Sequence, residues 1–338
     1  MLEVTQQIRE LHGCAPDSIP EEVLRSSEPL VLRGLAGDWP LVQAAKKSAK
    51  DARSYIRQFD SGDPLTVFKG NSGTDGRIFY NSDFSGFNFD PLRLSLSDVF
   101  ASLDTPEQDG EPPMLYVGST MIDKWLPGFR EENDLKLAQR EPIASIWMGN
   151  RSRIAAHYDV PTNIACSVAG RRRFTVFPPN QLKNLYVGPL DFTPAGQPIS
   201  LVDFAKPDYD QFPQFRDALK VAQVVELEPG DALLIPSMWW HHVEALDSFN
   251  VLVNYWWRDT PAYLGPPINA LQHAMMSLRD LPPAQREAWK QIFDHYVFDQ
   301  KEEHIQHIPK QVRGVLNTMD EPLARNIRKL LLNKFKQN

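Results

Sequence analysis

The chain has 338 residues, of which 42% are hydrophobic and 23% charged. This composition is typical of globular proteins and excludes a collagen-like or wholly disordered chain. The 36 basic and 43 acidic residues give a formal net charge of −7, which disfavours a nucleic-acid partner bound across the whole surface. The two cysteines, Cys14 and Cys166, are too few for a disulfide scaffold or a cysteine-based zinc site.

The sequence has no apolar run of the length needed to span a membrane. Its first ten residues, MLEVTQQIRE, include acidic residues and lack the apolar stretch of a secretory signal. We therefore expect a cytoplasmic protein with no membrane partner.

The first hundred residues mix helical and strand patterns. A helix is expected over 4–12, ended by Gly13, because its apolar residues recur at helical spacing. Further along, we expect strands at 29–35, 65–70 and 76–81 and helices at 51–59 and 95–103.

The stretch 112–260 consists mainly of short apolar or alternating runs punctuated by Gly, Pro and Asp, as in an all-β barrel or sandwich. Residues 180–220 interrupt it; they are too polar and proline-rich for core strands, and we interpret them as a long inserted loop. The expected strands are 114–118, 144–149, 163–170, 172–177, 223–227, 232–235, 241–246 and 250–257.

After Pro267 the apolar residues change to the i, i+3, i+4 spacing of helices. Helices are expected at 269–281, 283–298, 308–319 and 321–335. We therefore expect two domains: a β domain with N-terminal α/β additions over residues 1–262, and a helical region over 263–338.

The clearest chemical feature is a His-x-Asp pair, His157 and Asp159, in an expected strand. Alternate strand residues share a face, so both side chains project together. A histidine from the Trp-Trp-His-His run at 239–242 would complete the two-histidine, one-carboxylate set that holds non-haem Fe(II). Because His-x-Asp pairs are common, a hydrogen-bonded core histidine and a turn aspartate are the alternative. Neighbouring strand residues face opposite ways, so only one of His241 and His242 joins the site, and alternation does not decide which.

The strand-rich stretch contains a further series of motifs: AHYD at 156–159, Asn163, Gly170 with a basic residue two places later, FPP at 177–179, PGDALLIPSMWWHHVEAL at 229–246 and VNYWW at 253–257. In this order they resemble the JmjC-domain oxygenases that depend on Fe(II) and 2-oxoglutarate. Through VDFAKPDYDQFPQF at 202–215 and PLVLRGLAGDWP at 29–40, the likeness extends to the cupin-like branch that includes the asparaginyl hydroxylase acting on hypoxia-inducible factor (factor inhibiting HIF).

This resemblance implies a mainly β fold, a double-stranded β-helix (jelly roll) of the cupin type, followed by the helical region. It implies Fe(II) as cofactor, 2-oxoglutarate as cosubstrate and O₂ as oxidant. His157, Asp159 and His241 are then the metal ligands and the catalytic set, and His242 faces away in a structural role.

The resemblance also implies a cosubstrate site. Tyr116 and Arg172 would bind the C5 carboxylate of 2-oxoglutarate, while Asn163 and Asn254 lie near its C1 end. Arg172 stands where the family usually has lysine; an arginine fork can hold a carboxylate bidentately. Arg171 or Arg173 takes this role if the hairpin is shifted by one residue. Trp256 shares a face with Asn254 and is expected either to wall the site or to pack in the core.

The implied activity is hydroxylation of a C–H bond coupled to decarboxylation of 2-oxoglutarate to succinate. The substrate, a protein side chain, a tRNA base or a small molecule, is left open. A non-catalytic cupin that binds or scaffolds is one alternative, and the arginine at 172 is the feature that favours it. A different metal-dependent cupin enzyme is another, disfavoured by Asn163, Arg172 and Asn254.

The resemblance favours a homodimer built by the C-terminal helices. The basic segment 325–338 is interpreted as a helix end favoured by the helix dipole, and a nucleic-acid site there is the less favoured reading. His304 and His307 are interpreted as a solvated helix surface.

Overall fold

The computed structural model describes the whole chain except residues 1, 3, 72, 105–111, 195 and 337–338. The chain divides into two compact units, residues 1–258 and residues 259–338.

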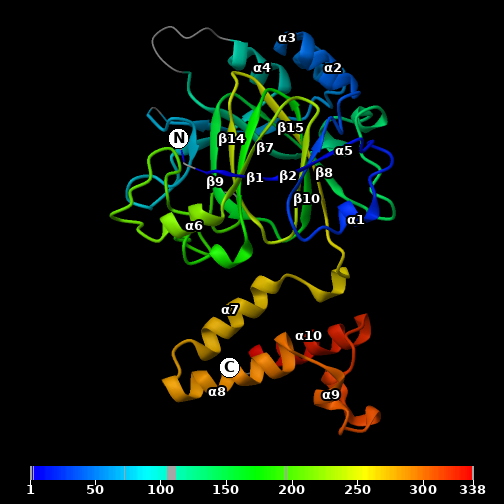
Figure 1. Cartoon of the computed structure of the whole chain (residues 1–338), viewed down its shortest axis with the longest axis vertical. Coiled ribbons are helices and arrows are strands. Elements are labelled where there is room, and N and C mark those ends of the chain that lie inside the picture. The colour runs from blue at the N-terminus through cyan, green and yellow to red at the C-terminus, as the bar shows by residue number, and fades with distance from the viewer. Residues whose placement is uncertain (1, 3, 72, 105–111, 195, 337–338) are drawn as a thin grey trace. The chain divides into compact units, whose positions relative to one another are not determined.

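The first unit contains two β-sheets (Figure 1). The smaller sheet has the strand order β1 (Gln6–Gln7), β12 (Gln223–Leu227), β11 (Arg172–Phe177), β14 (Trp240–Ala245), β9 (Ser152–Tyr158) and β5 (Arg77–Ile78). The larger sheet has the order β2 (Arg9–His12), β3 (Leu30–Arg33), β13 (Ala232–Ile235), β10 (Thr162–Ala169), β15 (Asn250–Trp257), β8 (Ile143–Gly149), β7 (Leu115–Met121), β4 (Leu65–Gly70) and β6 (Phe89–Leu94).

Strands β8 to β15 form the centre of both sheets. Within the larger sheet they run β8-β15-β10-β13, and within the smaller sheet β9-β14-β11-β12, so the chain passes repeatedly from one sheet to the other. Neighbouring strands among these eight are antiparallel. This order is that of a jelly roll, and the expected double-stranded β-helix with helical additions is confirmed.

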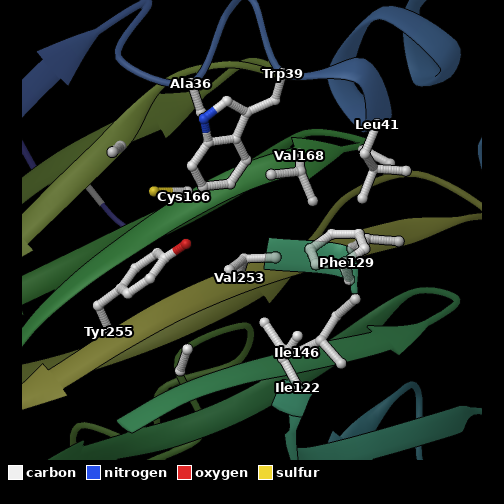
Figure 2. Close-up of a cluster of buried hydrophobic side chains, with 14 of the residues drawn as sticks. Ala36, Trp39, Leu41, Ile122, Phe129, Ile146, Cys166, Val168, Val253 and Tyr255 are labelled. Atoms are coloured by element: carbon white, nitrogen blue, oxygen red, sulfur yellow. The ribbon is translucent and has the colours of Figure 1, made fainter. Parts of the chain in front are cut away.

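Apolar side chains fill the space between the sheets and cover both outer faces. Phe174 and Leu233 belong to the layer between the sheets, while Phe204 and Phe215, from the segment 178–222, cover the smaller sheet. On the outer face of the larger sheet, Trp39 lies over side chains of β10 and β15 (Figure 2). Because β10 is buried on both faces, its sequence reads as a continuous apolar run rather than an alternating one.

Helices cover the larger sheet. Side chains of α2, α3, α4 and α5 join its outer apolar layer, and α2, α3 and α4 lie together at one end of the sheets (Figure 1). The hydroxyl of Ser48 accepts the backbone N–H of Asp51 and caps α3, satisfying a donor that the first turn leaves free. The helices of this unit are α1 (Glu21–Leu24), α2 (Pro40–Lys47), α3 (Ala49–Arg57), α4 (Leu96–Asp104), α5 (Ile122–Trp125) and α6 (Phe215–Val221), with 3₁₀ turns at Phe129–Glu131 and Pro179–Gln181.

The second unit is helical, and the described part of it buries few apolar side chains. It contains α7 (Pro267–Leu278), α8 (Pro283–Phe293), α9 (Glu302–Ile305) and α10 (Glu321–Phe335), a π-helical turn at Asp294–Phe298, and 3₁₀ turns at Ala262–Leu264, Lys310–Val312 and Gly314–Leu316. Asp320 caps α10 by accepting the N–H of Leu323. Each helix in the described ranges is too short or too polar to cross a lipid bilayer.

Three sequence-based expectations are wrong. Residues 4–12 form β1 and β2 instead of a helix, because they pair in parallel with β12 and β3; long-range pairing overrides the local spacing. Residues 308–319 form two 3₁₀ turns instead of a helix, with Pro309 and Gly314 at their starts. His304 is not a solvated partner of His307; its ring stacks on that of His295, with centroids 4.5 Å apart.

Candidate active site

Three side chains from two neighbouring strands converge between the sheets. His157 is in β9, His241 lies directly opposite it in β14, and Asp159 follows β9 immediately. The His241 Nε2 atom is 3.7 Å from an oxygen of Asp159, and the two imidazole centroids are 4.3 Å apart. One donor atom from each of the three residues lies within 4.8 Å of the others. The structure therefore brings together the three residues that the motifs single out.

Hydrogen bonds fix the orientation of each of these groups. The Nδ1 atoms of His157 and His241 lie 3.0 and 3.1 Å from the backbone carbonyls of Ala155 and Trp239. A carbonyl only accepts, so each Nδ1 carries the hydrogen and each Nε2 keeps a free lone pair. A histidine that ligates a metal through one ring nitrogen typically donates the N–H of the other to a carbonyl or carboxylate, as both Nδ1 atoms do here.

The carboxylate is held as well. The indole N–H of Trp256 donates to Asp159 at 3.0 Å, and the backbone carbonyl of Asp159 accepts the N–H of Met238 at 2.8 Å. Burial, with a smaller contribution from the neighbouring His157, lowers the pKa of His241, so its ring is neutral at pH 7 and free to coordinate. Two imidazoles with free Nε2 atoms and one carboxylate form the donor set typical of non-haem Fe(II) sites with open positions. The residues present fit that metal.

A cavity of about 300 Å³ adjoins the three donors, and Arg172 lies in its wall. Arg172 is the first residue of β11 and points inward with Phe174, whereas its neighbours point outward. Arg171 pairs with Asp247 at 3.0 Å and Arg173 with Glu226 at 2.6 Å. Of the three consecutive arginines, Arg172 is therefore the one that lines the cavity, and no shift of the hairpin occurs.

The buried guanidinium lacks a counterion among the described residues. Arg172 is 3% exposed, its Nε has no hydrogen-bond partner, and burial lowers its pKa to about 10. Burial disfavours the charged form of Tyr116 too, and so raises the pKa of this second wall residue. The charge of Arg172 opposes that shift. An unpaired buried cation is costly, so this end of the cavity fits an anion that accepts from the guanidinium and the phenol.

Two asparagines, Asn163 and Asn254, also line the cavity. The indole N–H of Trp147 donates to Asn254 at 2.7 Å, and the Asn254 amide donates to Asn163 at 3.2 Å. Both asparagines are buried. The chain of bonds leaves the amide N–H₂ of Asn163 free to donate into the cavity.

Residues 16–263 match the family model described as the cupin-like domain. The chain belongs to the cupin-like domain family. In this family member the match spans the eight central strands and the N-terminal additions from residue 16 onward, but not β1 and β2.

Named relatives share the same region. HSPB1-associated protein 1 of Bos taurus is 26% identical over 262 residues, covering 71% of this chain and 50% of the relative. Lysine-specific demethylase 8 of Xenopus tropicalis is 24% identical over 266 residues, covering 76% and 54%. tRNA wybutosine-synthesizing protein 5 of Gallus gallus is 30% identical over 146 residues, covering 39% and 43%. The chain thus spans about half the length of these curated relatives.

The second histidine of the run in this cupin-like chain points to the outer face of the smaller sheet. The His242 ring lies 4.4 Å from that of Phe204, and burial lowers its pKa to about 3. Neither of its ring nitrogens has a hydrogen-bond partner. His242 is therefore a neutral, packed side chain on the opposite face of β14 from the three donors.

Two contacts at the site were missed by sequence reasoning. Trp147 was not singled out, although it lies on the opposite face of β8 from the core residues Ile146 and Met148, and this parity marks it as inward-facing. Trp256 was expected as wall or core, but its hydrogen bond to Asp159 depends on how β15 aligns with the residues after β9, which no local pattern encodes.

Proposed function

We propose that this chain is an Fe(II)- and 2-oxoglutarate-dependent oxygenase that hydroxylates a C–H bond of a protein side chain or another substrate. The observation that carries the proposal is a three-donor metal site sharing one cavity with a buried arginine that has no counterion. A redox-inactive metallo-cupin has no need of such a cation, whereas a dicarboxylate cosubstrate requires one.

The donors His157, Asp159 and His241 would hold the iron. Arg172 and Tyr116 would bind the C5 carboxylate of 2-oxoglutarate, a bidentate arginine contact replacing the lysine usual in related oxygenases. When bound, the iron supplies activation of O₂, which is coupled to decarboxylation of 2-oxoglutarate to succinate and CO₂ and to oxidation of the substrate C–H bond.

The remaining residues position the reactants. The free amide of Asn163, steadied by Asn254, would donate to the C1 end of the cosubstrate. Trp147 and Trp256, with ring centroids 5.7 Å apart and planes nearly perpendicular, wall off that end from water. No side chain has to move a proton, which agrees with a cavity whose histidines keep their Nδ1 hydrogens committed to backbone carbonyls.

The assay is conversion of 2-oxoglutarate to succinate by protein loaded with Fe(II) without O₂ and then exposed to air. We expect succinate to form slowly without added substrate, and Asp159→Ala to abolish it together with metal retention. Asp210→Ala, an aspartate exposed on the inserted segment, is the matched control and should behave as wild type. Absence of both succinate and Fe(II)-dependent 2-oxoglutarate binding in the wild type would refute the proposal.

Relatives named as a lysine-specific demethylase and as a tRNA wybutosine-synthesizing protein give two alternatives for the substrate, a methylated lysine or a tRNA base. The asparaginyl-hydroxylase branch remains a prediction from the motifs. Screening for succinate release above the basal rate with peptide, tRNA and metabolite pools separates these classes.

We also propose that the second unit assembles two copies of the chain. Among its described residues the buried apolar side chains are Ile305 and Ala324, whereas many large ones are exposed, which is typical of an interface. The unit presents both an apolar groove between α7 and α8, lined by Met275, Trp289 and Phe293, and an exposed apolar stripe on α10 that includes Leu330 and Leu331. A two-fold dimer would place the stripe of each copy in the groove of the other.

Light scattering after size exclusion tests this assembly. Leu330→Asp, on the apolar stripe, should give a monomer. Leu332→Asp carries the same substitution in the same helix but on its basic side, and should remain dimeric. A monomeric wild type, or equal effects of the two variants, would contradict the proposal.

A further inference from the structure

Most polar groups in the cavity wall are already committed, if the proposed function holds. The indole N–H groups of Trp147 and Trp256 donate to Asn254 and Asp159. The metal would engage the histidine lone pairs, and the cosubstrate would engage Arg172, Tyr116 and the Asn163 amide. Among the described residues lining the cavity, Ser119 is the remaining side chain with a hydrogen-bonding group not assigned to either.

Ser119 is placed at the cavity by an irregularity in β7. The pairing of β7 with β8 shifts register between Val117 and Thr120, and Ser119 within this bulge has φ +28°. Bulges turn a side chain away from its regular direction and are frequent beside active sites. A non-glycine residue at positive φ is strained and persists only when its surroundings require it.

The neighbouring glycine lets the bulge sit close to the aromatic wall. A Cβ at Gly118 would meet Tyr116 at 3.3 Å, Phe68 at 3.5 Å and Trp147 at 3.6 Å. The Ser119 side chain is exposed, lines the cavity and makes no hydrogen bond with a described residue. Its hydroxyl is thus a free donor and acceptor at the open side of an otherwise aromatic wall.

The charges of the cavity cancel without a substrate. Among the described wall residues Asp159 supplies the one carboxyl group and Arg172 the one guanidinium, and the metal and the dicarboxylate would pair with them. A cationic group entering this space would lose its hydration with no free carboxylate to replace it, a cost of several kcal/mol. Cation–π attraction to the tryptophans returns only about 0.5–2 kcal/mol.

We propose that Ser119 is a substrate-contacting specificity residue and that the substrate group reaching this cavity is uncharged. This inference rests on the proposed function and narrows its substrate class. The Ser119 hydroxyl hydrogen-bonds a neutral polar substrate, whereas a carboxylate at the same position would select a cation.

The test compares two small probes of equal shape, choline and its uncharged carbon analogue 3,3-dimethylbutan-1-ol. Binding is followed by saturation-transfer NMR on the full chain loaded with Zn(II) and 2-oxoglutarate, a combination that undergoes no turnover. Wild type should bind the alcohol about tenfold more tightly than choline, which corresponds to about 1.4 kcal/mol. Ser119→Asp should reverse this preference, and the neutral control Ser119→Asn should keep it.

Retention of 2-oxoglutarate is measured first for all three proteins. If none retains it, the proposed function fails and this inference falls with it. If all retain it, then tighter binding of choline by wild type, an unchanged ratio in Ser119→Asp, or no binding of either probe overturns this inference alone.

Discussion

The hydrogen bond from Trp256 to Asp159 allows a sharp test of the metal site. Trp256→Phe keeps an aromatic ring in the wall but removes the indole N–H, which donates to the carboxylate at 3.0 Å. A hydrogen bond to a charged group contributes about 1.5–3 kcal/mol. Loss of that contribution from a ligand held in place by its neighbours should weaken metal binding roughly 10- to 100-fold.

The matched control is Trp147→Phe. This variant makes the same chemical change in the same wall, but its indole N–H donates to Asn254 at 2.7 Å instead of to a metal ligand. We expect its metal affinity to equal that of wild type and its affinity for 2-oxoglutarate to fall, because Asn254 no longer steadies Asn163.

Both affinities are measurable in competition with a chromophoric chelator under anaerobic conditions, with thermal melting to verify the fold. Unchanged metal affinity in Trp256→Phe would show that the indole does not orient the carboxylate. An equal loss in Trp147→Phe would show that the two tryptophans act merely by filling space, and either result refutes the reasoning.

Three further substitutions probe the cavity and its surroundings. Arg172→Met should abolish 2-oxoglutarate binding in calorimetry yet raise the melting temperature of the unliganded protein, since the burial that lowers the pKa of this arginine to about 10 costs about 3 kcal/mol. His242→Leu should leave metal binding intact and unfolding free energy unchanged or about 1 kcal/mol higher, because both ring nitrogens are buried without partners. Gly170→Ala should lower the chemical-denaturation midpoint and weaken 2-oxoglutarate binding together, because this residue has φ +67° and an added Cβ would meet the side chain of Asn250.

Much of the barrel was predictable because its signals are local. Strands β10 and β15 are long apolar runs, and Gly and Pro mark most of the turns, so their existence follows from composition and periodicity. Helix α3 was predictable from spacing and from its cap at Ser48. The strand β2 was not, because its structure comes from pairing with β3 some twenty residues away, and the local sequence carries an equally good helical pattern.

The candidate site was predictable to the level of residue identity but not of contacts. Alternation along β11 places Arg172 inward with Phe174, yet the sequence left its two arginine neighbours as alternatives because hairpin register is a property of both strands. The structure resolves this through acidic partners outside the cavity: Asp247, between β14 and β15, holds Arg171, and Glu226 of β12 holds Arg173. These ion pairs involve residues outside β11. The sequence of that strand alone therefore does not show which arginine faces the cavity.

Alternation fails at β9, the strand that carries His157. A strict period of two would place Arg153 on the same face as His157, but Arg153 pairs with Asp203 outside the cavity, and Ile154 lines the cavity instead. The cause is an extra residue in β9: His241 pairs with His157, but Val243 pairs with Ile154. The extra residue lies between Ile154 and His157, next to Ala155. The carbonyl of Ala155 is 3.0 Å from the His157 Nδ1 atom and orients the ring. The irregularity that breaks the alternation therefore lies beside the carbonyl that orients this histidine.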